Sequence, residues 1–306
     1  MPPRQGIPDE EVVNADDGLP GGSCLLMNAH TEISRFAFHK IRDYVRRTAG
    51  IMIGAEKTAL VTGRLWRRLE LLGLNNYEDY VAYVASPAGE QERNTMLDLL
   101  TTNETYFFRE PAHFKFLRDE IIPQQGARNF RVWCAAASTG EEPHSIAMVL
   151  ADTLGNRNWE VLATDISGKV LEQARTGVYR AERINHIPQD YLQRFCRRGI
   201  GEYEGMLAVV PSLRANITFE QHNLLHLRRS MAQFDVIFLR NVLIYFDNDT
   251  KQTVIDNLMQ ALRPGGWLIL GHCESLQGLD AGLTTVSPSI YRKPGAAQSV
   301  ARRIAG

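Results

Sequence analysis

Apolar residues recur with a helical period in the first third of the chain. Across residues 33–122 they share a face at intervals of three and four, most clearly in the stretch 77–84. Pro111 suits the first turn of a helix, where its missing N–H costs nothing. The pattern predicts a small all-helical domain followed by a connecting helix.

Beyond Gly126 short β-rich runs alternate with helical stretches. The β-rich runs are FRVWCAA, WEVLATD, ITFEQHN, FDVIFLRN and GWLILGH, and helical patterns such as EEPHSIAMVLADTL and SGKVLEQAR lie between them. This alternation is typical of an α/β fold, a parallel sheet covered on both faces. Residues 176–215 interrupt it and predict a small antiparallel insertion, and LTTVSPSIYRK predicts an antiparallel hairpin at the sheet edge.

These patterns predict four parts. They are a flexible tail (1–32), a helical domain (33–105), an α/β domain (106–293) with its insertion at about 176–215, and a flexible C-terminal tail (294–306).

Composition narrows the class of protein. Apolar residues make up 44% and charged residues 23%, which excludes wholesale disorder. The sequence holds neither an apolar run of transmembrane length nor a signal peptide pattern in its first residues, so we expect neither. The four cysteines are scattered without a CxxC motif, which favours a reducing, cytoplasmic setting over a disulfide scaffold or zinc ribbon.

Charge is unevenly distributed although the net charge is −1. Residues 1–32 carry −5 and residues 33–70 carry +6. Within the basic part, Lys57, Arg64 and Arg68 are spaced to form one stripe along a helix. Such a stripe is either a solvated helix face or a docking surface for an acidic partner.

The segment 131–147, RVWCAAASTGEEPHSIA, predicts a strand, a tight turn and a helix start. Small residues and exposed N–H groups there favour close approach of a ligand, although an ordinary strand–helix turn would look the same. Asp165 ends the next predicted strand, where it could either cap the following helix or accept hydrogen bonds from a ribose. Together the two features indicate a cofactor that contains a nucleoside.

The segment TTNETYFFREP, residues 101–111, joins the two predicted domains. Asn103 and Thr105 could bind a ligand's polar groups and Arg109 offers a planar cation, or the segment could simply be a capping turn. Its aromatic residues 106–108 are expected to belong to the core.

FDVIFLRNVLIYFD, residues 234–247, is a buried strand with a polar break at its end. Arg240 and Asn241 fall where ligands bind in open α/β sheets, and Tyr245 follows them. These side chains could instead satisfy loop carbonyls or pack.

His222 and His226 are four residues apart but have no third ligand nearby and do not lie in an HExxH helix. We therefore expect no metal site. The sequence also contains neither a GxSxG motif nor a P-loop, which argues against hydrolase and kinase chemistry.

Six motifs in this order resemble the CheR-type chemotaxis methyltransferases. They are TTNETYFFRE, AAASTGEEPHSIA, ATDIS, HNLL, FLRNVLIYF and LRPGGWLILGHCESL, and the resemblance runs from about Ile33 to Lys293. It implies a Rossmann-like methyltransferase domain that uses S-adenosylmethionine, forms S-adenosylhomocysteine and methylates glutamates of chemoreceptor cytoplasmic domains.

The resemblance also assigns residues. It places at the cofactor Asn103, Thr105, Arg109, Glu142 (or its neighbour Glu141), Asp165, Asn223, Leu224, Arg240 and Asn241, and it places Arg109 and Tyr245 beside the transferring methyl group. It matches Lys57 and Arg64 to the docking surface, to which the helical spacing adds Arg68. It further implies that the insertion binds a tethering peptide at a receptor's C-terminal end. A methyltransferase acting on nucleic acid, or a cofactor-binding module without catalysis, are the alternatives; we expect neither a nucleic-acid partner nor insertion into a membrane.

Overall fold

A computed structural model describes residues 32–124, 126, 128–155, 158–228, 231 and 233–295. The chain divides into two units, residues 1–32 and residues 33–306, and the described helices and strands all belong to the second unit. Residues 1–31 of the predicted N-terminal tail and 296–306 of the predicted C-terminal tail lie outside the described residues. Within the described ranges, each helix is too short or too polar to cross a lipid bilayer.

The helical domain is built from four α-helices around one core. They are α1 (Arg35–Ala49), α2 (Thr58–Leu72), α3 (Tyr77–Ala85) and α4 (Glu90–Leu100), with the 3-10 turns η1 (Ala55–Lys57) and η2 (Pro87–Gly89) between them. Ser34 caps α1 by accepting from the N–H of Ala37, and Gly50 ends it in the left-handed conformation. The helical period therefore predicted this domain correctly.

A mixed sheet forms the centre of the α/β domain, which follows the helical domain in the same unit. Among the described residues its strand order is β6-β2-β1-β7-β8-β10-β9. The strands are β1 (Phe130–Cys134), β2 (Trp159–Asp165), β6 (Ile217–Gln221), β7 (Phe234–Leu239), β8 (Leu262–Leu270), β9 (Thr284–Ser287) and β10 (Ile290–Arg292). The first five named run parallel and β9–β10 adds the predicted antiparallel hairpin at the edge.

Helices cover both faces of this sheet. They are α5 (Pro111–Phe116), continued by η3 (Leu117–Ile121) and η4 (Ile122–Gln124), then α6 (Glu141–Leu154), α7 (Gly168–Thr176) and α10 (Asn248–Ala261), with η7 (Leu243–Tyr245) before the last. Val132 packs into the cluster on the α6 face, whereas its neighbour Trp133 packs into the cluster on the α10 face. The two-residue period of the strand accounts for this division.

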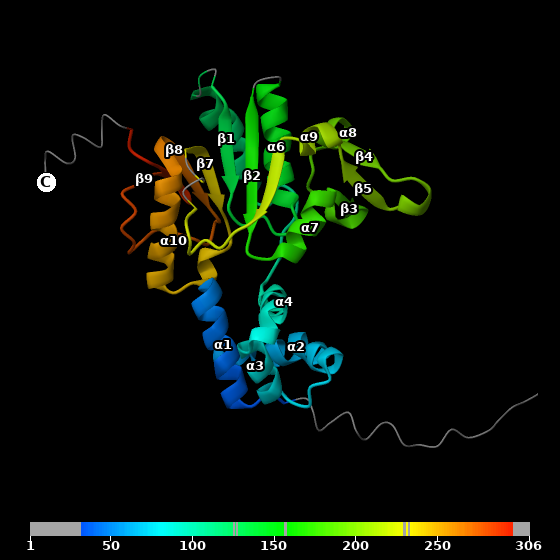
Figure 1. The fold of residues 1–306 in the computed structure, drawn as a ribbon. Coiled ribbons are helices and arrows are strands. Elements are labelled where there is room, and N and C mark those ends of the chain that lie inside the picture. Colours follow the sequence, from blue (N-terminus) through cyan, green and yellow to red (C-terminus); the bar gives the residue numbers. More distant parts are fainter. Residues whose placement is uncertain are drawn as a thin grey trace, which may run out of the picture. The chain divides into compact units, whose positions relative to one another are not determined.

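The predicted insertion is a separate three-stranded antiparallel sheet, β3-β5-β4. Its parts are β3 (Val178–Arg180), η5 (Ala181–Arg183), α8 (Gln189–Phe195), β4 (Cys196–Arg198), η6 (Gly201–Tyr203), β5 (Met206–Val209) and α9 (Pro211–Arg214). Figure 1 shows it beside the main sheet, next to α7.

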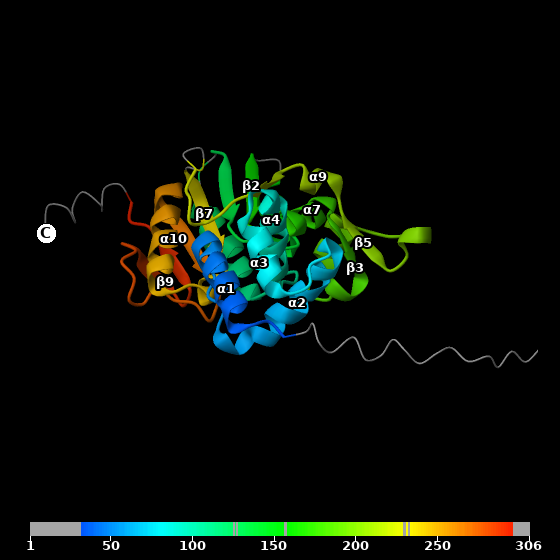
Figure 2. The same ribbon diagram turned by 60° about the horizontal axis from the view of Figure 1, so that its bottom comes forward.

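The helical domain lies at the carboxyl ends of the parallel strands. Figure 1 shows α1–α4 at the ends to which the strand arrows point, and Figure 2 shows them in front of the sheet once that side is turned forward. Ile51 forms a β-bridge with Phe246, and the N–H of Met52 donates to the carbonyl of Tyr245 at 2.8 Å. These contacts place the segment after α1 against the loop after β7.

Candidate functional site

A cavity of about 1190 Å³, including the open space at its mouth, lies between the strand ends and the helical domain. It is lined by all the residues predicted for the cofactor and the methyl group, namely Asn103, Thr105, Arg109, Glu142, Asp165, Asn223, Leu224, Arg240, Asn241 and Tyr245. Lys57 lines it as well. Four of the lining segments follow β1, β2, β6 and β7 and meet here because the carboxyl ends of parallel strands share one edge of the sheet; the other two come from the helical domain and the segment between the domains.

The turn between β1 and α6 forms one wall. Ser138 adopts a φ of 47°, and Gly140 a φ of 97°, where an added Cβ would lie 2.7 Å from the hydroxyl of Tyr179. Only glycine fits such a left-handed, crowded position without strain. The N–H of Ser138 donates to Asp165 Oδ2 at 2.8 Å, which fixes the turn to the end of β2.

Asp165 presents a buried carboxylate to the cavity. Oδ1 accepts the N–H of Ser167 at 3.0 Å and Oδ2 accepts that of Ser138. Burial raises the pKa of Asp165, and these backbone donors work against the rise. An ionised carboxylate has about four acceptor positions, so two backbone donors leave capacity for two hydroxyl groups of a ribose.

Arg240 is the centre of a buried ion network. Its guanidinium lies 2.5 Å from Glu142 Oε2 and 3.0 Å from Glu110 Oε2, and it also donates to the carbonyl of Arg109. Burial would raise the pKa of Glu110, but the charge of Arg240 and its hydrogen bond outweigh burial and lower it. The buried Nε of Arg240 has no hydrogen-bond partner among the described residues, so the site retains an unused donor.

The two adjacent glutamates of α6 point to different places. Glu142 lines the cavity, whereas Glu141 is fully buried beside Thr139 and forms an ion pair with Arg183 at 2.8 Å. The structure thus brings Glu142 to the other predicted cofactor residues. Its contact with a cofactor remains a prediction.

Glu274, absent from the sequence-based site, holds the loop after β7. Its carboxylate accepts the backbone N–H groups of Asn241, Val242, Leu243 and Gly271 at 2.7–2.8 Å. Asn241 has a φ of 59°, a strained value for a residue with a side chain. The carboxylate therefore fixes the backbone that carries Asn241 and leads to Tyr245.

The segment between the domains is tied to the turn before α6. The hydroxyl of Ser138 donates to the carbonyl of Asn103 at 3.1 Å, and Arg109 Nη1 donates to the carbonyl of Glu104 at 2.8 Å. Phe107 and Phe108 are buried as expected. The expectation for Tyr106 was wrong, because its ring is exposed and packs against His186 at 4.8 Å.

Asn223 connects the sheet to the helical domain. Its Nδ2 donates to the carbonyl of Thr48 at 2.6 Å, and its Oδ1 accepts the N–H of Leu225. This amide thus holds the end of α1 as well as lining the cavity. A contact from this position to a cofactor would involve the second N–H of Nδ2, the remaining acceptor capacity of Oδ1 or the backbone.

The predicted basic stripe is only partly open to solvent. Lys57 is exposed and lies in η1, just before α2. Arg64 donates to the carbonyls of Leu99, Leu100 and Thr101, and Arg68 forms a two-pronged ion pair with the buried Glu92. Two of the three side chains therefore stabilise the helical domain itself.

Histidines occur near the cavity in two arrangements. His222 is buried against the ring of Trp133, and burial lowers its pKa to about 4. His226 is exposed, and the pair gathers no third ligand within the described residues. A different group, Glu110, His113 and His272, does bring three potential ligand atoms within 4.8 Å of one another.

Comparison with known proteins assigns both domains. Residues 37–101 match the model of the CheR methyltransferase all-alpha domain, and residues 103–291 match that of the CheR methyltransferase, SAM binding domain. The chain is 40% identical over 279 residues to a chemotaxis protein methyltransferase of Escherichia coli (strain K12), covering 89% of this chain and 97% of that one. It is 39% identical to chemotaxis protein methyltransferase 2 of Pseudomonas aeruginosa, covering 86% and 95%. The chain therefore belongs to the CheR methyltransferase family.

Proposed function

We propose that this protein transfers a methyl group from S-adenosylmethionine to glutamate side chains in the cytoplasmic domains of chemoreceptors. The products are glutamate methyl esters and S-adenosylhomocysteine. The observation that carries the proposal is the cavity at the strand ends, where Asp165, Glu142 and Arg240 meet Arg109 and Tyr245. The relatives named above are chemotaxis protein methyltransferases, which supports receptors as the substrate class.

The polar groups of the cavity suit an adenosyl sulfonium cofactor. Asp165 offers acceptors for a ribose diol, and the carboxylate of Glu142 suits the amine of the methionyl part. The guanidinium of Arg109 is a donor for a carboxylate. When bound, S-adenosylmethionine supplies a methyl group already activated by the positive sulfur.

The substrate needs positioning and not activation. A glutamate side chain has an unperturbed pKa of about 4.3, so it is already a carboxylate nucleophile at neutral pH. His222, which also lines the cavity, has a pKa lowered to about 4 and is therefore only a weak base, which agrees with a reaction that needs none. Arg109 steers the incoming carboxylate, and Tyr245 limits its approach. Orientation of this kind can be worth about 7–11 kcal/mol.

Receptor recognition would use two surfaces. Lys57, exposed at the cavity mouth, attracts an acidic receptor helix. The insertion leaves β3 and β4 as edge strands and exposes Ile200 and Tyr203 beside them. A receptor's C-terminal tethering peptide could add to such an edge as a further strand.

Incubation with radiolabelled cofactor and purified receptor cytoplasmic domains tests the proposal. We expect label on the receptor that is released by mild base, because carboxyl methyl esters hydrolyse there while N-methyl groups do not. A receptor whose candidate glutamates are changed to alanine is the matched control. Base-stable label, or label that moves to added nucleic acid, would overturn the proposal.

A further inference from the structure

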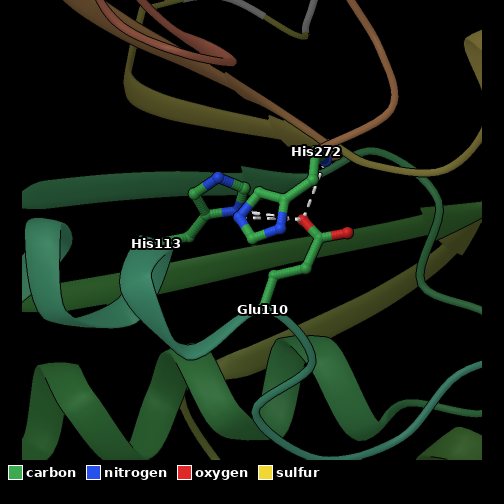
Figure 3. A group of neighbouring side chains, drawn as sticks. All are labelled: Glu110, His113 and His272. Atoms are coloured by element: carbon green, nitrogen blue, oxygen red, sulfur yellow. Dashed lines mark hydrogen bonds and ion pairs between the residues drawn. The ribbon is translucent and has the colours of Figure 1, made fainter.

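Three potential metal ligands gather beside the cavity but outside its lining. Glu110 precedes α5, His113 lies in the first turn of that helix, and His272 follows β8 (Figure 3). His113 Nδ1 is 3.3 Å from Glu110 Oε2, and His272 Nε2 is 3.9 Å from the same oxygen. Elements that are far apart in the sequence thus direct two imidazoles at one carboxylate oxygen.

The hydrogen bonds around His113 leave its Nδ1 without a partner. His113 Nε2 lies 3.1 Å from the hydroxyl of Ser289, which also donates to the carbonyl of Pro288, and the tautomer of the ring sets which group donates in the first pair. A neutral imidazole that donates at Nε2 carries a bare lone pair at Nδ1. His113 is 2% exposed, and its Nδ1 has no hydrogen-bond partner among the described residues. In that tautomer the lone pair of Nδ1 faces Glu110 Oε2, whose other neighbours are the guanidinium of Arg240 at 3.0 Å and the backbone N–H of His272 at 3.1 Å.

We propose that Glu110, His113 and His272 bind one divalent transition-metal ion, with Zn²⁺ as the representative. Bonds of about 2.0–2.2 Å in a tetrahedral site separate neighbouring ligand atoms by about 3.3–3.5 Å. The observed separations of 3.3 and 3.9 Å lie close to that range. A cation between His113 Nδ1 and Glu110 Oε2 would form two metal–ligand bonds and would share Oε2 with Arg240 and the backbone N–H of His272.

The ligand set and its exposure favour a borderline metal that exchanges with solvent. Two imidazoles and one carboxylate suit Zn²⁺, Co²⁺ or Ni²⁺ better than Mg²⁺ or Ca²⁺, which prefer oxygen ligands. The side chain of His272 is 53% exposed, so the ion can reach the site and keep a water at its open position. The Nε2–Ser289 hydrogen bond fixes the ring of His113, as outer partners of metal-bound histidines do.

The positive charge of Arg240 is the main feature that opposes binding of a cation at Glu110. Its guanidinium lies 3.0 Å from Glu110 Oε2, the oxygen that both histidines face. Glu142, at 2.5 Å, supplies a second carboxylate for Arg240, and Asn241 Nδ2 holds Glu110 Oε1 at 3.4 Å. Glu110 can therefore act as a metal ligand while Arg240 keeps Glu142 as its anionic partner.

Titration of the tag-free, full-length protein with Co²⁺ and Zn²⁺ after chelator treatment tests the site. We expect one Co²⁺ per chain with visible absorption typical of a low-coordinate site, displaced by Zn²⁺, and a Zn²⁺ affinity measured by calorimetry. His272→Ala, at an exposed position that leaves the fold intact, should weaken binding at least about 10-fold. Glu110→Gln should weaken it similarly while keeping the side-chain shape.

His226→Ala and Cys273→Ser are the matched controls, because each removes an exposed candidate ligand outside the proposed set. Both should bind Zn²⁺ like the unaltered protein. Equal affinity in His272→Ala, loss of binding in either control, or a dissociation constant weaker than about 100 μM would overturn the proposal. So would nitrogen NMR showing that His113 keeps a proton on Nδ1 at saturating Zn²⁺.

Discussion

The strand-end edge and the helical domain use their arginines differently. At the strand ends Arg240 has a side chain only 1% exposed, held between Glu142 and Glu110. In the helical domain the Arg68 side chain is 25% exposed and binds a single buried carboxylate, Glu92. One arginine is enclosed at the cavity, and the other joins α2 to α4. Removing an arginine side chain should therefore lower the free energy of unfolding more at the cavity than at the exposed parts of the protein.

The largest effect is expected at Arg240. Arg240→Met would leave two glutamates partly buried without their cation, which typically destabilises a protein by about 3–5 kcal/mol. Arg46→Met is the control, because Arg46 pairs with Asp247 at 2.8 Å while 57% exposed, and exposed pairs contribute about 1 kcal/mol or less. Urea denaturation of both variants measures the difference. Equal losses would remove the distinction between the two regions.

Turnover is expected to depend most on two residues that carry no buried ion pair among the described residues. Arg109 donates to the carbonyl of Glu104, and Tyr245 is half-buried at the cavity. Arg109→Ala or Tyr245→Phe should slow single-turnover methylation about 100-fold, the scale of a small misplacement of reacting groups. Affinity for S-adenosylhomocysteine, measured by calorimetry, should change far less.

Parallel losses of rate and affinity in these variants would contradict the positioning role. Unchanged denaturation curves are the control, because neither substitution strands a buried charge. This separates the chemistry at the cavity from the stability that Arg240 provides.

Most of the fold could be predicted because the pattern of apolar residues within a single segment identifies each helix or strand. The runs WEVLATD and EEPHSIAMVLADTL coincide with β2 and α6. Asp165 and Arg240 could also be placed at one site, since both end strands of a parallel sheet. The resemblance, and not the spacing, supplied the roles of these residues.

The long-range partners could not be predicted. Glu274 accepts four backbone N–H groups from two loops, and Glu110 meets Arg240 from 130 positions away. The hydrophobic periodicity of the sequence does not predict these contacts, because each contact depends on where the folded chain places a backbone group or a charge. The stripe at Arg64 and Arg68 shows the same limit, since regular spacing does not reveal that a cation already has a partner.

The smallest effect, and the sharpest test of the outer region, is expected at Lys57. Its ammonium has no ion pair within the described part of the chain, so Lys57→Glu should leave stability unchanged and slow receptor methylation a few-fold at low salt. Raising the ionic strength to about 0.15 M, where the screening length is about 8 Å, should reduce that difference. Arg68→Met is the control: it leaves Glu92, 4% exposed, with the hydroxyl of Tyr80 and should lower stability while barely changing the receptor rate of the folded protein. Initial methylation rates across a salt series are the measurement for both variants. If the Lys57→Glu rate equals that of the unaltered protein at low salt, the cavity mouth does not attract the receptor by charge.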